Sequence, residues 1–477
     1  MTPERFAPVL AELAPLVERF VAAGERLLLV GGTVRDLLLS STTEGDFDLD
    51  LTTSARPPVV KRLVDGWADA VWTQGERFGT IGAKHGGRIY EITTFRAEVY
   101  PDESRKPSVT FADDIEVDLS RRDFTVNAMA LELGLCDVAP QLIDPFGGVT
   151  DLAAKVLRTP LDPEISFGDD PLRMLRAARF IAGHELKPTA ELVAAVEAMA
   201  ARMSIVSAER IRDELDKLMV LDHPSAGLWF LVDTALADQF LPELPGLRLE
   251  HDPIHRHKDV LSHTIAVIEN VQSSLVSSTD WDLRITRLAA LFHDVGKPRT
   301  RGYAKGKGTT FHHHDVVGAR MTRLRMAELR YPKREIEAVS ELVALHLRFH
   351  TYRLGWSDAA VRRYVRDAGE LLGELNVLTR CDCTTRNARK AAQLSKRMDE
   401  LEVRIVELAE QEALEAVRPE LDGSAVMAHL GIAPGPIVGE ALAFLLELRL
   451  DEGVLGEVEA YRRLDRWYEE RDASTVG

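Results

Sequence analysis

The sequence predicts an α+β protein, in which a head with a mixed sheet precedes an almost wholly helical body. Short apolar and β-branched runs, separated by glycine-rich or polar turns, recur through roughly the first 160 residues and are typical of strands. From Asp169 onward such runs nearly disappear, and apolar residues recur with the 3.6-residue period of helices. The two parts of the chain therefore differ in secondary structure.

The predicted strands all lie in the head. An amphipathic helix occupies the first 20 residues and comes before them. Each strand is bounded by glycine or polar turn residues, which limits it to a short segment. We expect strands at 26–30, 47–53, 88–96, 129–135 and 139–144.

The helical body is divided by segments rich in proline and glycine. They lie at 241–255, 418–427 and 431–440. Such segments end helices and commonly mark boundaries between groups of them. We therefore expect four parts along the chain: a head (1–160), a helical neck (161–240), a third domain (241–400) and a helical tail (401–477).

The composition excludes several classes of protein. Hydrophobic residues make up 45% and charged residues 28% of the 477, which argues against disorder and against membrane insertion. The N-terminus lacks the parts of a signal peptide, and Cys136, Cys381 and Cys383 are too few for a disulfide framework. The sequence thus predicts a cytoplasmic protein with no membrane partner.

The net charge of −17 argues against a general nucleic-acid coat protein, because such proteins are usually basic. The segment 170–217 is an exception, since its eight basic residues balance its eight acidic ones. A site for a polyanion is therefore expected to be local, and DNA is not expected as a partner.

An acidic strand is the first candidate for chemistry. Asp46, Asp48 and Asp50 are spaced by two, so a strand would project all three from one side. Asp48 and Asp50 can chelate Mg²⁺, and Glu91 could join them from a neighbouring strand. Divalent ions held in this way can activate a hydroxyl and stabilise a leaving pyrophosphate. The alternative is a solvated acidic strand face.

Two glycines precede this strand. Gly31 and Gly32 lie between the apolar strand at 26–30 and a helix that begins with Val34 and Arg35. Backbone amides at such a turn suit an anionic phosphate. A tight strand-to-helix turn without a ligand is the alternative interpretation.

Five motifs occur in a fixed order along the head and neck. Together they resemble the class II tRNA nucleotidyltransferase and poly(A) polymerase family, and five ordered motifs are a highly specific signal. The motifs are GGTVRDLLL with DLD (31–50), RRDFTVNAMAL (121–131), DPFGGVTDL (144–152), DDPLRMLRAARF (169–180) and SAERIRDEL (207–215).

The resemblance implies a polymerase-beta-like nucleotidyltransferase head that adds C, C and A from CTP and ATP to tRNA 3′ ends without a template. It implies catalytic roles for Asp48, Asp50 and Glu91, with Mg²⁺ on the two aspartates, whereas Asp46 has no counterpart. The residues that it implies for nucleotide binding are Gly31, Gly32, Arg35, Arg121, Arg122, Asp123, Asn127, Asp170, Arg173, Arg176 and Arg179.

The motif at 169–180 is predicted to read the base. On a helix, Asp170 and Arg173 would be neighbours on one face, as would Arg173 and Arg176. An Asp–Arg pair can accept from an exocyclic amine and donate to a ring acceptor, a combination that cytosine and adenine share. The alternative is a surface salt bridge. Many relatives have Glu-Asp where this chain has Asp169-Asp170, which leaves the proposed pair intact.

The family also contains partial CC- or A-adding enzymes and poly(A) polymerases. Phe78-Gly79-Thr80 resembles the CCA-adding type, and the acidic total favours a partner docked at one place over tracking along RNA. Full CCA addition is therefore the prediction. A poly(A) polymerase and an HD phosphohydrolase with a nucleotide-binding head remain alternatives, and the carboxylates argue against a non-catalytic RNA-binding module.

A second metal site is predicted in the body. Imidazoles and carboxylates spread over helices can assemble a site for a divalent transition metal. The pattern resembles the HD superfamily of metal-dependent phosphohydrolases, and a purely structural HD domain is the alternative. The resemblance implies His263, His293, Asp294 and Asp382 as ligands, His314 and His346 as second-shell or additional ligands, and Lys297 as a phosphate contact; His257, His312 and His313 have no assigned role.

The tail resembles the segment that follows the HD region in bacterial relatives. Its helices look amphipathic on both sides of the turn at 431–436. Contact with the tRNA elbow is what the resemblance implies, and plain helical packing is the alternative.

Overall fold

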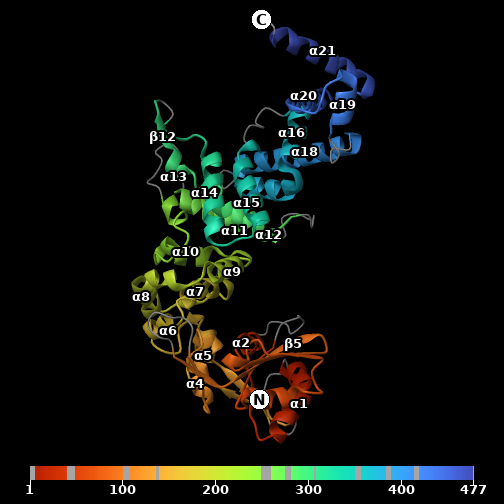
Figure 1. Cartoon of the computed structure of the whole chain (residues 1–477). Coiled ribbons are helices and arrows are strands. Elements are labelled where there is room, and N and C mark those ends of the chain that lie inside the picture. Colours follow the sequence, from red (N-terminus) through yellow and green to blue (C-terminus); the bar gives the residue numbers. More distant parts are fainter. Residues whose placement is uncertain are drawn as a thin grey trace. The chain divides into compact units, whose positions relative to one another are not determined.

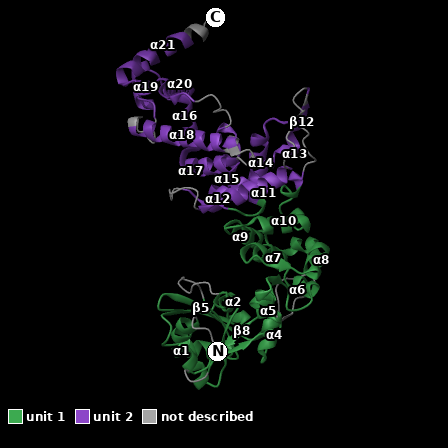
Figure 2. Cartoon of the chain, turned by 180° about the vertical axis from the view of Figure 1, so that it is seen from behind, with its two compact units in different colours: residues 1–245, 328–331 green, residues 246–327, 332–477 purple. Residues whose placement is uncertain are grey.

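A computed structural model of the chain shows two compact units (Figures 1 and 2). Unit 1 comprises residues 1–245 with 328–331, and unit 2 comprises 246–327 with 332–477. The described residues are 6–39, 49–99, 108–135, 139–248, 259–273, 281–305, 308–349, 356–382, 388–412 and 418–475.

A seven-stranded mixed sheet forms the head in unit 1, with strand order β3-β4-β5-β2-β1-β8-β9. The β2–β5 pair is parallel and the other neighbouring pairs are antiparallel. The strands are β1 (Leu27–Val30), β2 (Leu49–Thr53), β3 (Ala70–Trp72), β4 (Thr80–His85), β5 (Arg88–Thr94), β8 (Ala130–Glu132) and β9 (Gln141–Ile143).

The sheet forms around β1, which has no solvent-exposed residue. All four of its residues are buried, as expected for a central strand that is covered on both faces. Leu28 and Val30 pack with Phe95, Leu119 and Ala128 in one apolar cluster. The α+β class and the predicted strands of the head are thereby confirmed.

Ten α-helices are described in unit 1, and the neck helices among them pack closely. In the neck, α7 packs against both α9 and α10. The helices are α1 (Ala7–Ala22), α2 (Gly32–Leu38), α3 (Pro57–Val64), α4 (Ile115–Ser120), α5 (Gly148–Ala153), α6 (Pro163–Asp169), α7 (Leu172–Gly183), α8 (Ala190–Met199), α9 (Ala208–Met219) and α10 (Ser225–Asp233), with 3-10 turns at η2 (Glu76–Phe78), η3 (Thr125–Asn127), η4 (Ala200–Ile205) and η5 (Ala237–Gln239).

Unit 2 is mainly helical, and α12 packs against α11, α15 and α17. Of the helices described, none is both long and apolar enough to cross a membrane. The helices are α11 (Val260–Asn270), α12 (Leu283–Phe292), α13 (Lys297–Thr300), α14 (His314–Glu328), α15 (Lys333–Leu345), α16 (Asp358–Ala368), α17 (Leu372–Asp382), α18 (Ala388–Glu412), α19 (Gly423–Leu430), α20 (Pro436–Glu452) and α21 (Glu457–Thr475).

Side-chain caps start many of these helices. Asp162 accepts a backbone N–H at the start of α6, Thr189 does so for α8, and Asp282 for α12. Each cap satisfies an N–H group that has no partner within its own helix. Local sequence therefore fixes where these helices begin.

Short strands also occur outside the main sheet, where the sequence predicted almost none. A hairpin joins β12 (Arg301–Ala304) to β13 (Gly308–Phe311), and β10 (Val156–Leu157) pairs with β11 (Lys187–Pro188). β6 (Arg96–Val99) pairs with β7 (Ser108–Phe111). The β12–β13 hairpin escaped prediction because its strands are short and polar and therefore show no apolar alternation.

The packing of α10 on α7 leaves no room for a side chain at Gly227. A Cβ atom there would lie 2.5 Å from the carbonyl oxygen of Ala178, whereas a Cβ at Gly168 would meet nothing nearer than 4.0 Å. We expect Gly227→Ala to lower the free energy of unfolding by about 1–3 kcal/mol through overpacking. Gly168→Ala, also in a helix, should raise it by up to about 1 kcal/mol. Urea unfolding of both variants measures the contrast, and equal effects would contradict the close packing.

Candidate functional sites

The turn between β1 and α2 brings together three residues of the predicted nucleotide site. Gly31 has a φ of 72°, a conformation that side chains disfavour. A Cβ atom on Gly31 would lie 3.0 Å from Nη1 of Arg122 and 3.5 Å from Oδ2 of Asp50. Glycine is thus required at position 31 for two reasons: its positive φ, and the close approach of the Arg122 guanidinium and the Asp50 carboxylate. Gly32 begins α2.

Two of the predicted catalytic carboxylates are aligned on adjacent strands. Asp50 of β2 lies directly opposite Glu91 of β5 in the parallel pair, and both are exposed. Residues in register on paired strands project from the same face of the sheet. Asp46 and Asp48 lie outside the described residues. The sheet therefore supplies a carboxylate face beside the Gly31 turn.

A chain of polar contacts links Arg35 to the neck. Its Nη1 donates to Oδ1 of Asn127 at 2.6 Å, and Nδ2 of Asn127 donates to Oδ1 of Asp123 at 3.0 Å. Arg176 of α7 then donates through Nε and Nη2 to Oδ2 of Asp123, at 2.9 and 2.6 Å. Burial by itself would raise the pKa of Asp123, but Arg176 and Asn127 outweigh it and hold the pKa at about 2. Four predicted nucleotide-site residues thus form one network.

Glu214 extends this network and was not singled out from the sequence. Its carboxylate is 3% exposed, accepts from Nε of Arg179 and lies 3.7 Å from Nη1 of Arg176. Buried carboxylates are rare unless they are paired. The motif at 207–215 contains this glutamate on α9, but only the packing of α9 on α7 shows which arginines it holds.

Asp118 is a second carboxylate of this region that the sequence did not single out. It is fully buried, and its carboxylate accepts from Nη2 of Arg121 at 2.7 Å and from Nη2 of Arg122 at 3.5 Å. Burial would raise its pKa, yet the two arginines bring it below the usual value. The spacings of three and four residues were the available signal, because they place these side chains on one helical face.

The predicted pairing of Asp170 with Arg173 on one helix is wrong. α6 ends at Asp169 and α7 begins at Leu172, and Asp170 between them is extended, with φ −139° and ψ 100°. A residue before proline avoids the helical conformation, and Pro171 follows Asp170.

The two side chains therefore have separate partners. Asp170 accepts from Nη2 of Arg210 at 2.7 Å and from the backbone N–H of Leu172 at 3.2 Å. Arg173 is buried and donates to Oγ of Ser166 at 2.9 Å and to the carbonyl oxygen of Arg121. Arg210, in the motif at 207–215, is a further residue that was not singled out.

The four predicted HD ligands come together in unit 2. Nε2 of His263 on α11 lies 2.9 Å from Oδ1 of Asp382 on α17, and 3.2 Å from Nε2 of His293. His293 lies 3.3 Å from Oδ2 of Asp294 and 3.5 Å from Oδ1 of Asp382. His263, His293 and Asp382 offer ligand atoms within 4.8 Å of one another. This donor set fits a divalent transition metal.

Asp294, His314 and His346 form a second group with the same spacing. Nδ1 of His314 contacts the carbonyl oxygen of Phe311 at 2.7 Å, and Nδ1 of His346 that of Val343 at 2.6 Å. Nε2 of both rings is buried: that of His346 has no hydrogen-bond partner among the described residues, and that of His314 lies 3.4 Å from Oδ1 of Asp294. A carbonyl on one ring nitrogen is the usual arrangement for a histidine that binds a metal through the other.

The charges of the cluster favour a cation. Burial would lower the pKa of His293, but Asp294 and Asp382 raise it to about 10. Burial and the neighbouring His293 lower the pKa of His346 to about 4, so that ring is neutral. Nζ of Lys297 lies 2.6 Å from Oδ2 of Asp294. His312 and His313 are exposed, and His257 lies outside the described residues.

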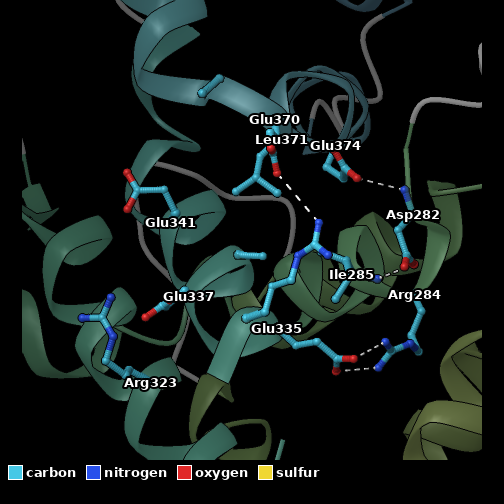
Figure 3. Close-up of a pocket in the computed structure, with 13 residues that line it drawn as sticks. Asp282, Arg284, Ile285, Arg323, Glu335, Glu337, Glu341, Glu370, Leu371 and Glu374 are labelled. Atoms are coloured by element: carbon cyan, nitrogen blue, oxygen red, sulfur yellow. Dashed lines mark hydrogen bonds and ion pairs between the residues drawn. The ribbon is translucent and has the colours of Figure 1, made fainter. Parts of the chain in front are cut away.

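A cavity of about 710 Å³ lies elsewhere in unit 2 (Figure 3). It is lined by the first residues of α12 and α15 and of α17, and its carboxylates include Asp282, Glu335 and Glu374. Acidic side chains are favoured at helix N-termini, and Glu335 also pairs with Arg284 at 2.8 Å. These carboxylates are explained by the helix ends, and none of the predicted site residues lines the cavity.

Three segments of the chain match known families. Residues 27–158 match the "Poly A polymerase head domain", and residues 185–247 match the "Probable RNA and SrmB- binding site of polymerase A". Residues 260–413 match the "HD domain". The matches follow the order that the motifs predicted.

Two relatives differ in how much of the chain they match. The A-adding tRNA nucleotidyltransferase of Deinococcus radiodurans is 35% identical over 461 residues, which cover 94% of this chain and 96% of the relative. The CCA-adding enzyme of Lactobacillus helveticus is 37% identical over 244 residues, which cover 51% of this chain and 58% of the relative.

Solved structures share the fold of this chain. The CCA-adding enzyme of Bacillus stearothermophilus in complex with CTP aligns with a TM-score of 0.70 and 22% identity, over 99% of this chain and 100% of that one. The Thermotoga maritima CCA-adding enzyme complexed with tRNA aligns with a TM-score of 0.60 and 20% identity, over 98% and 97%. At these identities the likeness shows the fold alone.

The low pKa of Asp123 makes the stability of unit 1 depend on pH. A depressed carboxyl pKa contributes stability above the unfolded value of about 4, and the contribution is lost as the pH falls through about 2. Asp123→Asn should lower the free energy of unfolding by about 2–3 kcal/mol at pH 7, because it removes the carboxylate closest to Arg176 and leaves only Glu214, 3.7 Å away. The difference from the wild type should shrink by about 1 kcal/mol at pH 3.

Urea unfolding at pH 7, 5 and 3 measures this difference. Asp113→Asn is the control, because the Asp113 side chain is 96% exposed and should contribute less than about 0.5 kcal/mol at each pH. A loss for Asp123→Asn that is the same at all three pH values would contradict the assigned charge state.

Proposed function

Because the chain belongs to the tRNA nucleotidyltransferase family, as its full-length relative shows, we propose that it adds C, C and A from CTP and ATP to the 3′ end of tRNA. The observation that carries the proposal is the convergence of Asp50 and Arg122 on the Gly31 turn. A carboxylate for a metal, a guanidinium for a phosphate and a bare backbone turn are the parts that a nucleoside triphosphate site needs. The chain is thus a nucleotidyltransferase, as the motifs predicted.

The proposed reaction is an in-line displacement at the α-phosphate. The RNA 3′ oxygen forms a bond to phosphorus, the bond to the β-phosphate oxygen breaks, and pyrophosphate leaves. The Gly31 turn and Arg122 orient the triphosphate, and Arg35 holds Asn127 in place beside it. Asp48, Asp50 and Glu91 are the carboxylates that would hold Mg²⁺, and the ion would supply positive charge near the reacting phosphate oxygens.

We assign base selection to Asp170 and Arg173, with one change from the sequence-based interpretation. The two side chains are held by separate partners, Arg210 for Asp170 and the Arg121 carbonyl for Arg173. Two independently oriented groups can still read the amine and the adjacent ring acceptor that cytosine and adenine share. Arg210 then acts as a positioning residue for the Asp170 carboxylate.

Addition of the terminal A alone is the second candidate. The Deinococcus radiodurans relative, which matches over 94% of this chain, is named for A addition. The Lactobacillus helveticus enzyme, named for CCA addition, matches over 51%. Phe78-Gly79-Thr80 resembles the CCA-adding type, so full CCA addition remains the main proposal.

For unit 2 we propose a divalent transition-metal site with phosphohydrolase activity toward RNA 3′ phosphates. His263, His293 and Asp382 would hold one ion, and Asp294, His314 and His346 offer donors for another. A metal in such a site supplies an activated water. The buried Nε2 of His346, which has no hydrogen-bond partner among the described residues, and Nε2 of His314, 3.4 Å from Oδ1 of Asp294, support the site. Hydrolysis would clear damaged tRNA ends before nucleotide addition.

The proposal includes the division of the chain and its place in the cell. We keep the division into a nucleotidyltransferase head (1–160), a neck (161–240), an HD domain (241–400) and a tail (401–477). Contact of the tail with the tRNA elbow remains part of the proposal. A tRNA-processing role is consistent with a cytoplasmic location.

A tRNA extension assay distinguishes the candidates. The protein is incubated with tRNA that ends at the discriminator base and with tRNA that ends in CC, each with CTP, ATP or both, and the 3′ ends are sequenced. Addition of C, C and A to the first substrate is the expected result. Addition of a single A to the second substrate only would establish the A-adding candidate, and long A tails would indicate a poly(A) polymerase.

Two aspartate substitutions should separate the two activities. Asp50→Asn removes a metal ligand in the head and should slow nucleotide addition by at least about 100-fold without changing phosphohydrolase activity. Asp294→Asn should have the opposite effect and should also lower the bound transition metal measured by elemental analysis. Each variant is the control for the other, and loss of both activities on either change would argue against two separate sites.

A further inference from the structure

Residues at both ends of the β12–β13 hairpin contact the HD cluster. Before β12, Lys297 begins α13, and its Nζ lies 2.6 Å from Oδ2 of Asp294. After β13, the carbonyl oxygen of Phe311 contacts Nδ1 of His314 at 2.7 Å. The Lys297 ammonium lies 5.8 Å from the centre of the Phe311 ring. The base of the hairpin is therefore built from the same residues as the edge of the cluster.

This segment is basic within an acidic chain. Residues 295–314 contain five Lys or Arg residues and no Asp or Glu, whereas the whole chain has a net charge of −17. Arg299, Arg301 and Lys305 are exposed, and within the described part of the chain none of them forms an ion pair. Unpaired cations on an exposed hairpin leave their charge available to a polyanion.

One face of the hairpin leads away from the cluster. Arg301 and Tyr303 are two residues apart on β12 and so project from the same face. Phe311 lies opposite Arg301, and Thr309 lies opposite Tyr303 in the antiparallel register. Tyr303 is 81% exposed, which is unusual for an aromatic side chain. From the cluster outward, the face thus presents the Lys297 ammonium, the Arg301 guanidinium and the Tyr303 ring.

We propose that this hairpin binds the single-stranded 3′ end of an RNA and presents its terminal phosphate to the HD cluster. Cations contact the phosphodiester backbone, and an exposed aromatic ring stacks on a base, which together are the features of single-strand binding. This inference rests on the phosphohydrolase proposed for unit 2 and names the surface that would hold its RNA substrate.

Hydrolysis of an RNA 3′ end that carries a 2′,3′-cyclic phosphate needs only water as a co-reactant. The water oxygen forms a bond to phosphorus, the bond between phosphorus and O2′ breaks, and a proton from the water passes to O2′. The product is a 3′-phosphate, the kind of RNA end on which the phosphohydrolase proposed above acts. Lys297, between Asp294 and the hairpin, is placed to contact the non-bridging oxygens.

The test compares a short unstructured oligoribonucleotide with a mononucleotide, both ending in a 2′,3′-cyclic phosphate, as substrates of the full chain. Tyr303→Ala should raise KM for the oligonucleotide about tenfold, and Tyr303→Phe, which keeps the ring, should restore it. Arg299→Ala with Arg301→Ala should reduce the slope of log KM against log salt by about 1.4. Hydrolysis of the mononucleotide should be unchanged in all variants.

Lys333→Ala with Lys396→Ala is the matched control, because these side chains are 91% and 78% exposed on helices of the same unit. The control should behave as the wild type with both substrates. Equal losses for the oligonucleotide and the mononucleotide would overturn the proposal, since the hairpin would then only support the metal site.

Photocrosslinking separates failure of this inference from failure of the phosphohydrolase. The same oligonucleotide with 4-thiouridine at its 3′ end should crosslink to a peptide within 297–305, and the double arginine variant should lose this crosslink. If neither substrate is hydrolysed, the phosphohydrolase proposal fails. The crosslink then tests by itself whether the hairpin binds RNA. Absence of the crosslink in the wild type would overturn the RNA-binding hairpin.

Discussion

The structure of unit 1 depends on a set of buried arginine–carboxylate contacts. Asp123 holds Arg176 and is linked through Asn127 to Arg35, while Glu214 holds Arg176 from the neck. Removing charges from water costs several kcal/mol for each ion, and this cost is offset only when partners lie at close range. Each contact therefore fixes the position of the next, and together they hold the first neck helices in place against the head. The residues of the proposed nucleotide site therefore also hold the unit together.

The same constraint shapes unit 2 with different groups. Asp294 and Asp382 are placed among histidines, and Lys297 adds a further cation at the edge of the cluster. The carbonyl contacts of His314 and His346 leave Nε2 of each ring within the cluster, and Nε2 of His346 has no hydrogen-bond partner among the described residues. A buried polar atom without a partner is costly, so the arrangement favours an ion that would satisfy it. Burial and charge together make this cluster a candidate metal site.

Sequence reasoning succeeded where a local pattern has one physical interpretation. The strands of the head follow from apolar runs between turns, and the glycine turn before Asp50 follows from its position between a strand and a helix. It failed where a neighbour in sequence was taken for a neighbour in space: Pro171 breaks the helix expected through Asp170, so the Asp170–Arg173 pair does not form. The β12–β13 hairpin was missed because four-residue polar strands leave no periodic signal.

The sequence by itself determined the α+β class, the order of the motifs and the identity of nearly all the candidate side chains, because these depend on local periodicity and on residue type. The tertiary structure decided which charges meet. Asp118 and Glu214 look like ordinary helix residues until burial leaves each with arginines as partners. The register of β2 and β5, which sets Asp50 opposite Glu91, likewise depends on pairing between strands far apart in the chain. Contacts of this kind are fixed by packing and desolvation of the whole unit, and no short stretch of sequence contains them.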